Sequence, residues 1–170
     1  MAILLSNLSE GITDRSLYLY DTFDGMTPAT EVDVSVTGVH GGHYLEGTQK
    51  SKNDVIWAFA PLEDVKKNVR STHYPEGKVF YIQGPVEVTL RQAENTPSLI
   101  ALLRLDTDWY ESTKFELEVL YDRVAPGGCI IIDDYGHWEG AKKAVDEFFA
   151  DKPVLMHRID YTGRLIILGM

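Results

Sequence analysis

The feature that most constrains this 170-residue chain is a series of short, continuously apolar segments that alternate with segments of helical periodicity. A strand with one wet face alternates apolar and polar residues, whereas a strand covered on both faces is apolar throughout. Parallel strands also need a crossover between them, which is usually a helix. The pattern therefore predicts an α/β fold with a mostly parallel sheet and helices on both faces.

Predicted strands and helices follow one another along the whole chain, which is expected to form a single domain over residues 1–170. Strands are expected at 17–23, 78–83, 98–105, 129–132, 153–159 and 164–169, and helices at 2–10, 54–69, 85–92, 109–124 and 138–150. Residues 126–128 read Pro-Gly-Gly and are predicted to form a turn. Only a tight turn at 161–163 joins the last two strands, so they should pair antiparallel.

Composition and charge exclude several classes of function. The formal net charge is −10, which is the opposite of a surface that binds nucleic acid or an anionic membrane. No segment approaches the roughly 18 apolar residues of a membrane span, and residues 1–8 lack the basic leader of a signal peptide. The single cysteine, Cys129, cannot form an intrachain disulfide and is expected to be a small buried hydrophobe. We therefore expect a reducing, cytoplasmic setting with no nucleic-acid or membrane partner.

Residues 25–53 form the longest connection in this prediction, and they are polar and rich in glycine. Long ordered loops are often lids or binding loops, so a lid or substrate loop is expected here. His40 and His43 lie in this loop. They face either a substrate or solvent, and solvent is the commoner place for loop histidines.

Carboxylates follow two consecutive predicted strands at the point where each strand ends. Asp106 and Asp108 follow one strand, and Asp133 and Asp134 follow the next. Ligands of open parallel sheets bind outside the carboxyl ends of the strands, and neighbouring strands lie about 4.8 Å apart. Crowded carboxylates repel one another and take up protons unless a cation neutralises them. Because Mg²⁺ prefers oxygen ligands, the sequence predicts a divalent metal site here.

The alternative for these four acids is helix capping without a metal. Asp108 could be the N-cap of the helix at 109–124, and Asp133 with Asp134 could cap the helix at 138–150. Residues next to the acids also allow two interpretations. His137 could reach the metal or simply begin the next helix. The flanking aromatic residues wall an acceptor site or belong to the core; they are Trp109, Tyr110, Tyr135 and Trp138.

Two long motifs resemble the macrocin O-methyltransferase (TylF-like) family. Residues 102–113 read LLRLDTDWYEST, and residues 131–136 read IIDDYG after the Pro-Gly-Gly at 126–128. Residues 20–26 read YDTFDGM and are similar to the second-strand motif of the same family. The resemblance runs from about Leu4 to Leu168. It implies a Rossmann-like methyltransferase fold whose sheet ends in an antiparallel hairpin.

The resemblance also implies a reaction. Members of the family use S-adenosylmethionine (AdoMet) and a divalent metal such as Mg²⁺ to methylate hydroxyls of sugars in secondary metabolites. Carried over, Asp106, Asp133 and Asp134 would be metal ligands. Asp108 would be the general base or a further ligand, so that Asp106 and Asp108 would form the catalytic pair. A small-molecule hydroxyl acceptor, such as a sugar or glycoside, would then be the substrate.

The same resemblance implies an AdoMet site at the ends of two earlier strands. Asp21 would lie near the AdoMet ribose, together with its neighbours Thr22 and Phe23. Gly84 would border the adenine.

The sequence departs from the family at its start. The family has a first strand that ends in a Gly-rich turn and lies between the second and fourth strands. Here Met1 falls in the helix that would follow. We therefore expect an N-terminally truncated fold whose sheet has a gap or closes differently, and whose AdoMet binding is weak. A catalytically inactive subunit for binding or oligomerisation is the alternative to an enzyme, and a homo-oligomer stays open.

Overall fold

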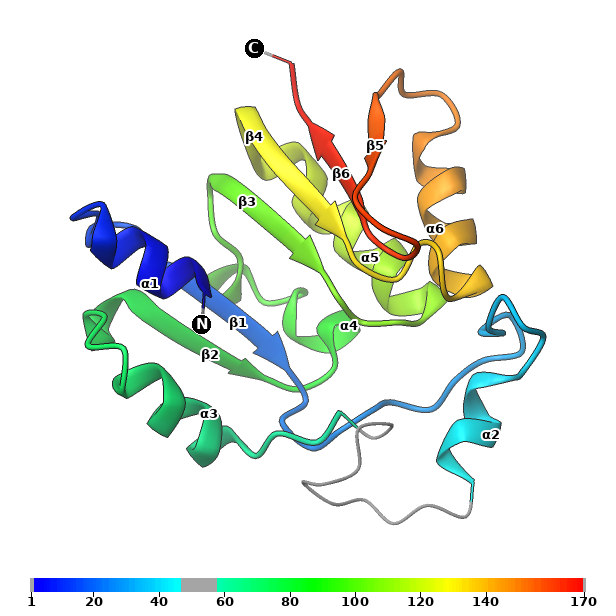
Figure 1. Ribbon diagram of the computed structural model, residues 1–170, viewed down its shortest axis with the longest axis horizontal. Helices are drawn as coiled ribbons and strands as arrows, with labels where there is room; N and C mark the ends of the chain where they lie inside the picture. Colours follow the sequence, from blue (N-terminus) through cyan, green and yellow to red (C-terminus); the bar gives the residue numbers. More distant parts are fainter. Residues whose placement is uncertain (1, 47–57, 170) are drawn as a thin grey trace. The chain divides into compact units, whose positions relative to one another are not determined.

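The computed structural model describes residues 2–46 and 58–169, and these form two compact units (Figure 1). The first unit spans Met1–Thr27 and Gln49–Pro85, and the second spans Pro28–Thr48 and Val86–Met170. Part of the predicted loop at 25–53 and the start of the predicted helix at 54–69 lie outside the described residues. No helix in the described ranges is long and apolar enough to cross a membrane.

The first unit is a parallel two-stranded ladder covered on one face by helices. Strand β1, Leu17–Asp21, pairs with β2, Val79–Gln83, in the register Leu17↔Val79 to Asp21↔Gln83. Helices α1, Ala2–Ser9, and α3, Leu62–Arg70, pack on this ladder. Side chains alternate across a strand, so every second residue joins this core; its members are Leu4, Leu8, Leu17, Leu19, Val65, Val69, Tyr74, Val79 and Tyr81.

The second unit holds a four-stranded sheet in the order β3-β4-β6-β5. Strands β3, Ile100–Leu105, and β4, Val124–Ile132, run parallel. Strand β6, Arg164–Ile167, pairs antiparallel with both β4 and β5, Met156–Arg158. The predicted parallel sheet with a closing antiparallel hairpin is confirmed.

Helices α5, Tyr110–Leu120, and α6, Glu139–Phe149, lie side by side on this sheet (Figure 1). The short helices α4, Val86–Thr89, and α2, Gly41–Leu45, belong to the same unit. The core is formed by side chains that alternate along the strands or recur at helical spacing and are almost fully buried; they are Leu105, Leu117, Ile130, Ile132, Val145 and Ile166.

Three local predictions need correction. The Pro-Gly-Gly at 126–128 is not a separate turn, because it bulges out of β4 while Gly127 N still donates to Leu168 O at 3.1 Å. The helix predicted to reach residue 124 ends at Leu120 and tightens into a 3₁₀ turn at Tyr121–Arg123. Cys129 is half-buried rather than fully buried.

The two ladders are not hydrogen-bonded to one another within the described residues.

Candidate functional site

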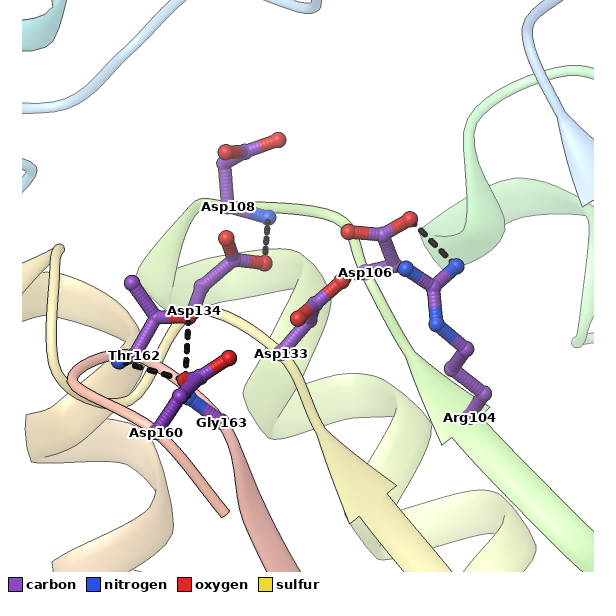
Figure 2. A network of polar contacts seen from close by, with 8 residues as sticks. All are labelled: Arg104, Asp106, Asp108, Asp133, Asp134, Asp160, Thr162 and Gly163. Atoms are coloured by element: carbon purple, nitrogen blue, oxygen red, sulfur yellow. Dashed lines mark hydrogen bonds and ion pairs between the residues drawn. The ribbon is translucent and has the colours of Figure 1, made fainter.

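The register of β3 and β4 places Asp106 beside Asp133. Leu105 pairs with Ile132, and Asp133 N donates to Leu105 O at 3.0 Å. The next residue of each strand therefore emerges at the same edge of the sheet. Arg104 Nη1 donates to Asp106 Oδ2 at 2.6 Å, and Arg104 Nη2 donates to Asp133 Oδ2 (Figure 2). One guanidinium thus binds carboxylates from two neighbouring strands.

Asp108 and Asp134 form a second, deeper pair at this edge. Asp108 N donates to Asp134 Oδ2 at 3.1 Å (Figure 2), and Trp138 Nε1 donates to Asp108 Oδ1 at 2.9 Å. Asp108 has φ +64°, in the left-handed region that L-residues rarely adopt, and such strain is commonly found at functional sites. Among the residues that the structure describes, neither carboxylate has an ion-pair partner.

Burial and mutual repulsion raise the pKa values of this cluster. Burial raises the pKa of Asp134 to about 8, and the charges of Asp108 and Asp106 add to the effect. Burial also raises the pKa of Asp108, although the hydrogen bond from Trp138 opposes this. Burial raises the pKa of Asp106, and the charge of Arg104 offsets part of it. These carboxyls therefore bind protons more readily than free ones do, and a nearby cation would oppose that shift.

A further carboxylate, Asp160, lies in the turn between β5 and β6. Gly136 N donates to Thr162 O at 2.9 Å, which holds this turn beside the loop that follows β4. Asp160 Oδ1 accepts from Gly163 N at 2.6 Å and from Thr162 N at 2.9 Å (Figure 2). These backbone hydrogen bonds lower the pKa of Asp160, so it adds a firmly ionised group at this end of the sheet. Sequence analysis identified only the turn.

Neither acid pair caps a helix with its side chains, so the capping alternative is wrong. Helix α6 follows Trp138 and has no side-chain cap. Helix α5 follows Trp109, and its first amide, Tyr110 N, donates to Asp33 Oδ1 at 2.7 Å. Asp33, which sequence analysis missed, is fully buried and also accepts from Thr30 N and Thr30 Oγ1 at 2.7 Å. No local sequence pattern marks a cap that lies 77 residues away.

The described part of the predicted substrate loop is anchored to the second unit. Ser35 bridges Trp138, and Val34 bridges His40. His40 Nδ1 accepts from Gly42 N at 3.0 Å, and its Nε2 lies 2.8 Å from Thr30 O, so His40 stabilises the loop. His43 is exposed and pairs with Glu46.

Two of the four flanking aromatic residues belong to the core. Trp109 and Trp138 are buried, with ring centroids 4.8 Å apart. The hydroxyls of Tyr110 and Tyr135 each donate at 2.7 Å to a carboxylate of α6, Glu147 and Asp146 respectively. His137 packs edge-on against Trp138 and lowers the pKa of Asp108 through its charge.

The four residues predicted to bind AdoMet lie together in the first unit. Gly84 N donates to Asp21 O at 3.0 Å, and Phe23 N donates to Asp21 Oδ1 at 2.7 Å. Thr22 Oγ1 donates to Gly25 O at 2.6 Å. The predicted strand at 17–23 ends at Asp21, because Phe23 turns into the left-handed region at φ +51° and becomes buried. Asp21 itself is exposed.

Comparison with known proteins identifies the family. The profile described as "Macrocin-O-methyltransferase (TylF)" matches residues 1–166. The chain belongs to this TylF family. It is 32% identical over 139 residues to demethyldecarbamoylnovobiocin O-methyltransferase of Streptomyces niveus, covering 82% of this chain and 49% of that protein. It is 27% identical over 124 residues to mycinamicin III 3''-O-methyltransferase of Micromonospora griseorubida, covering 73% and 45%.

A solved structure supports the same assignment. The O-methyltransferase NovP matches with a TM-score of 0.74 and 29% identity, covering 96% of this chain and 64% of that one. The Rossmann-like methyltransferase fold is thereby confirmed, and AdoMet is the cofactor of the family. The chain spans about half the length of the curated relatives it matches.

The acids at the ends of β3 and β4 can be tested for their fit to a divalent metal. Within residues 2–46 and 58–169, no three His, Cys, Asp or Glu side chains are arranged to hold a metal ion. The chemistry of the donor set nevertheless fits, since the Arg104 guanidinium already serves as a stand-in cation between Asp106 and Asp133. Hard carboxylate oxygens from two strands are the ligands that Mg²⁺ prefers.

Glu116 of α5 binds Thr107, the residue between Asp106 and Asp108. Sequence analysis did not identify this acid. It is 6% exposed, and its Oε2 accepts from Thr107 Oγ1 at 2.9 Å. Burial raises the pKa of Glu116 to about 8. Its helical position among apolar residues gave no sign that this acid points inward.

Proposed function

We propose that this chain is an AdoMet-dependent and divalent-metal-dependent O-methyltransferase that acts on a hydroxyl of a sugar or glycoside in a secondary metabolite. The observation that carries the proposal is the surplus of carboxylates at the ends of β3 and β4 in a member of the TylF family. The acceptor class comes from the relatives, one of which is named for transfer to a rhamnosyl group of a tetracenomycin.

Asp106, Asp133 and Asp134 are the residues that would hold the metal. Asp106 and Asp133 already converge on one cation, and Asp134 is the next residue after Asp133 in the segment that follows β4. A bound divalent metal supplies a Lewis acid that lowers the pKa of the acceptor hydroxyl. It would also offset the charges of Asp108 and Asp106, which add to the effect of burial in raising the pKa of Asp134.

Asp108 is the residue that would accept the hydroxyl proton. Trp138 Nε1 holds Asp108 Oδ1, which leaves Oδ2 to accept the proton. Bound AdoMet would supply the methyl group as a sulfonium: the hydroxyl oxygen would gain the methyl carbon, and the sulfur would keep the electron pair of the broken carbon–sulfur bond as a neutral thioether. Asp108 would keep the proton.

The first unit would bind AdoMet at the ends of β1 and β2. Asp21 Oδ1 is bound by Phe23 N, and its other oxygen is suited to a ribose hydroxyl. Gly84 has φ +133°, a conformation that favours glycine, and the missing side chain allows an adenine to approach the backbone. Thr22 and Phe23 would complete this site by fixing the turn.

Transfer of a labelled methyl group from AdoMet to sugar-bearing acceptors, with and without Mg²⁺, tests the proposal. We expect transfer that stops with a chelator, resumes with Mg²⁺, and is lost in Asp133→Asn. Asp151→Asn is the matched control, because Asp151 is exposed beyond the last turn of α6. Transfer that is unchanged by chelation would remove the metal from the proposal. Binding of AdoMet and Mn²⁺ without any transfer would favour a binding subunit.

A further inference from the structure

Arg104 binds two acids of the cluster, and the proposed reaction does not use its charge. Side chains two apart on a strand share a face, so Arg104 and Asp106 lie on one face of β3. Arg104 pairs in register with Ile131, and Asp133 is two residues further along β4. The register therefore places this guanidinium diagonally opposite Asp133 and beside Asp106. The arrangement is fixed by the sheet rather than by a loop.

The two contacts of Arg104 engage the carboxylates that the proposed metal needs. Arg104 binds Asp106 Oδ2 and Asp133 Oδ2 at the same time. The side chain is 48% exposed, so its long stem can leave the carboxylates without disturbing the core.

A divalent cation and this guanidinium cannot both occupy the same carboxylate oxygens. Two positive groups within contact distance repel each other strongly where water is partly excluded. Of the deeper carboxylates, Asp134 accepts from Asp108 N and Asp108 accepts from Trp138 Nε1, and neither makes an ion pair within the described residues. Arg104 therefore neutralises the outer pair only.

We propose that Arg104 is an internal counter-cation of Asp106 and Asp133, and that a divalent cation binds by displacing its guanidinium. The inference rests on the metal part of the proposed function. In the metal-free protein Arg104 holds the two strand ends together and lowers their repulsion. Its presence sets how tightly the metal binds, so Arg104 is a positioning residue and not a ligand.

The test measures Mn²⁺ binding to the full chain by calorimetry and by electron paramagnetic resonance, without substrate. Arg104→Met should bind Mn²⁺ about tenfold more tightly than the unsubstituted protein, because the competing charge is gone. Arg158→Met is the matched control, because β5 and β3 are the opposite edges of the same sheet. This control removes the same net charge and should change the affinity by less than about twofold.

Two further variants separate a failure of this inference from a failure of the proposed metal site. Arg104→Lys keeps the charge but cannot bind both carboxylates through a planar fork, so it should tighten Mn²⁺ binding by about threefold; it decides the question if Arg104→Met does not fold. Asp133→Asn should abolish the Mn²⁺ binding. Equal or weaker binding in the Arg104 variants, with the Asp133→Asn effect intact, overturns the inference alone. Absence of Mn²⁺ binding in every protein overturns the metal site as well.

Discussion

The carboxylates at the strand ends of the first unit and those of the second unit find their hydrogen-bond partners in opposite ways. At the ends of β1 and β2, Asp21 accepts from the amide two residues later and Gly84 N returns to Asp21 O. At the ends of β3 and β4, Asp106, Asp108, Asp133 and Asp134 share one arginine, one indole and one amide.

The difference teaches which polar strand ends are suited to a neutral group of a ligand and which are suited to a cation. A single acid that closes its own turn is satisfied by the backbone and needs nothing else. Four acids at two adjacent strand ends exceed the cationic partners that the described residues offer them, and burial raises the pKa of Asp106, Asp108 and Asp134. The first arrangement can accept one neutral hydroxyl group, whereas the second calls for a cation.

Asp108→Asn should give the largest effect, because it separates the base from the metal ligands. We expect the rate of methyl transfer to fall by about a thousandfold, in the range found for a lost general base. The affinity for Mn²⁺ should change little, since Asp106, Asp133 and Asp134 remain. A parallel loss of Mn²⁺ affinity would instead make Asp108 a ligand. Single-turnover transfer and Mn²⁺ titration on the same preparation measure both.

Gly140→Ala should give the next largest effect, on the scaffold that supports the acid cluster. A Cβ on Gly140 would overlap with Asp33 Oδ1, the atom that accepts from Tyr110 N at the start of α5. We expect the free energy of unfolding to fall by about 2 to 3 kcal/mol, as for other overpacked sites. Gly77→Ala meets no atom within 4 Å and should change it by less than about 0.5 kcal/mol. Urea unfolding of both variants would reveal whether the overlap is real.

Glu116, which is buried near the acid cluster, should make the free energy of unfolding depend on pH. Burial raises its pKa to about 8 in the folded protein from 4.5. A carboxyl that binds its proton more tightly when folded stabilises the fold below its unfolded pKa, and this contribution is lost as pH rises through about 8. Between these pH values the free energy of unfolding should fall by up to about 1.4 kcal/mol per pH unit, and by less in Glu116→Gln. Parallel slopes for the two proteins would contradict the prediction.

The sequence predicted the strands and their acid ends because both are local signals. An apolar run that stops at a carboxylate identifies β1, β3 and β4 without knowledge of their partners. The parallel pairing and the closing hairpin followed from the lengths of the connections. Sequence analysis predicted that Asp106 and Asp133 lie close together because consecutive strands are expected to be neighbours. The register of Leu105 with Ile132 confirms this.

What the sequence could not show depends on contacts between distant segments. Arg104 is a charged residue within the apolar strand β3, and its role depends on the register with Ile131, which no local pattern shows. Asp33 caps a helix far along the chain, and Asp108, the local candidate for that cap, is used elsewhere. The Pro-Gly-Gly signal correctly marked an irregular backbone, with φ +77° at Gly127, but the bonds to Leu168 keep it within the sheet.

Asp21→Asn should give the smallest effect, and it tests the other side of the comparison. If Asp21 Oδ2 accepts from a ribose hydroxyl, loss of its charge should weaken AdoMet binding by about tenfold, the cost of a hydrogen bond to a charged group. Stability should change little, because an asparagine Oδ1 can still accept from Phe23 N and close the turn. Asp14→Asn is the control, since Asp14 is exposed ahead of β1. Calorimetric titration with AdoMet measures the difference, and equal affinities for all three proteins would leave Asp21 as a turn residue only. The proposed AdoMet site of the first unit would then depend on Thr22, Phe23 and Gly84 without the Asp21 carboxylate, because a strand end that closes its own turn adds nothing to binding.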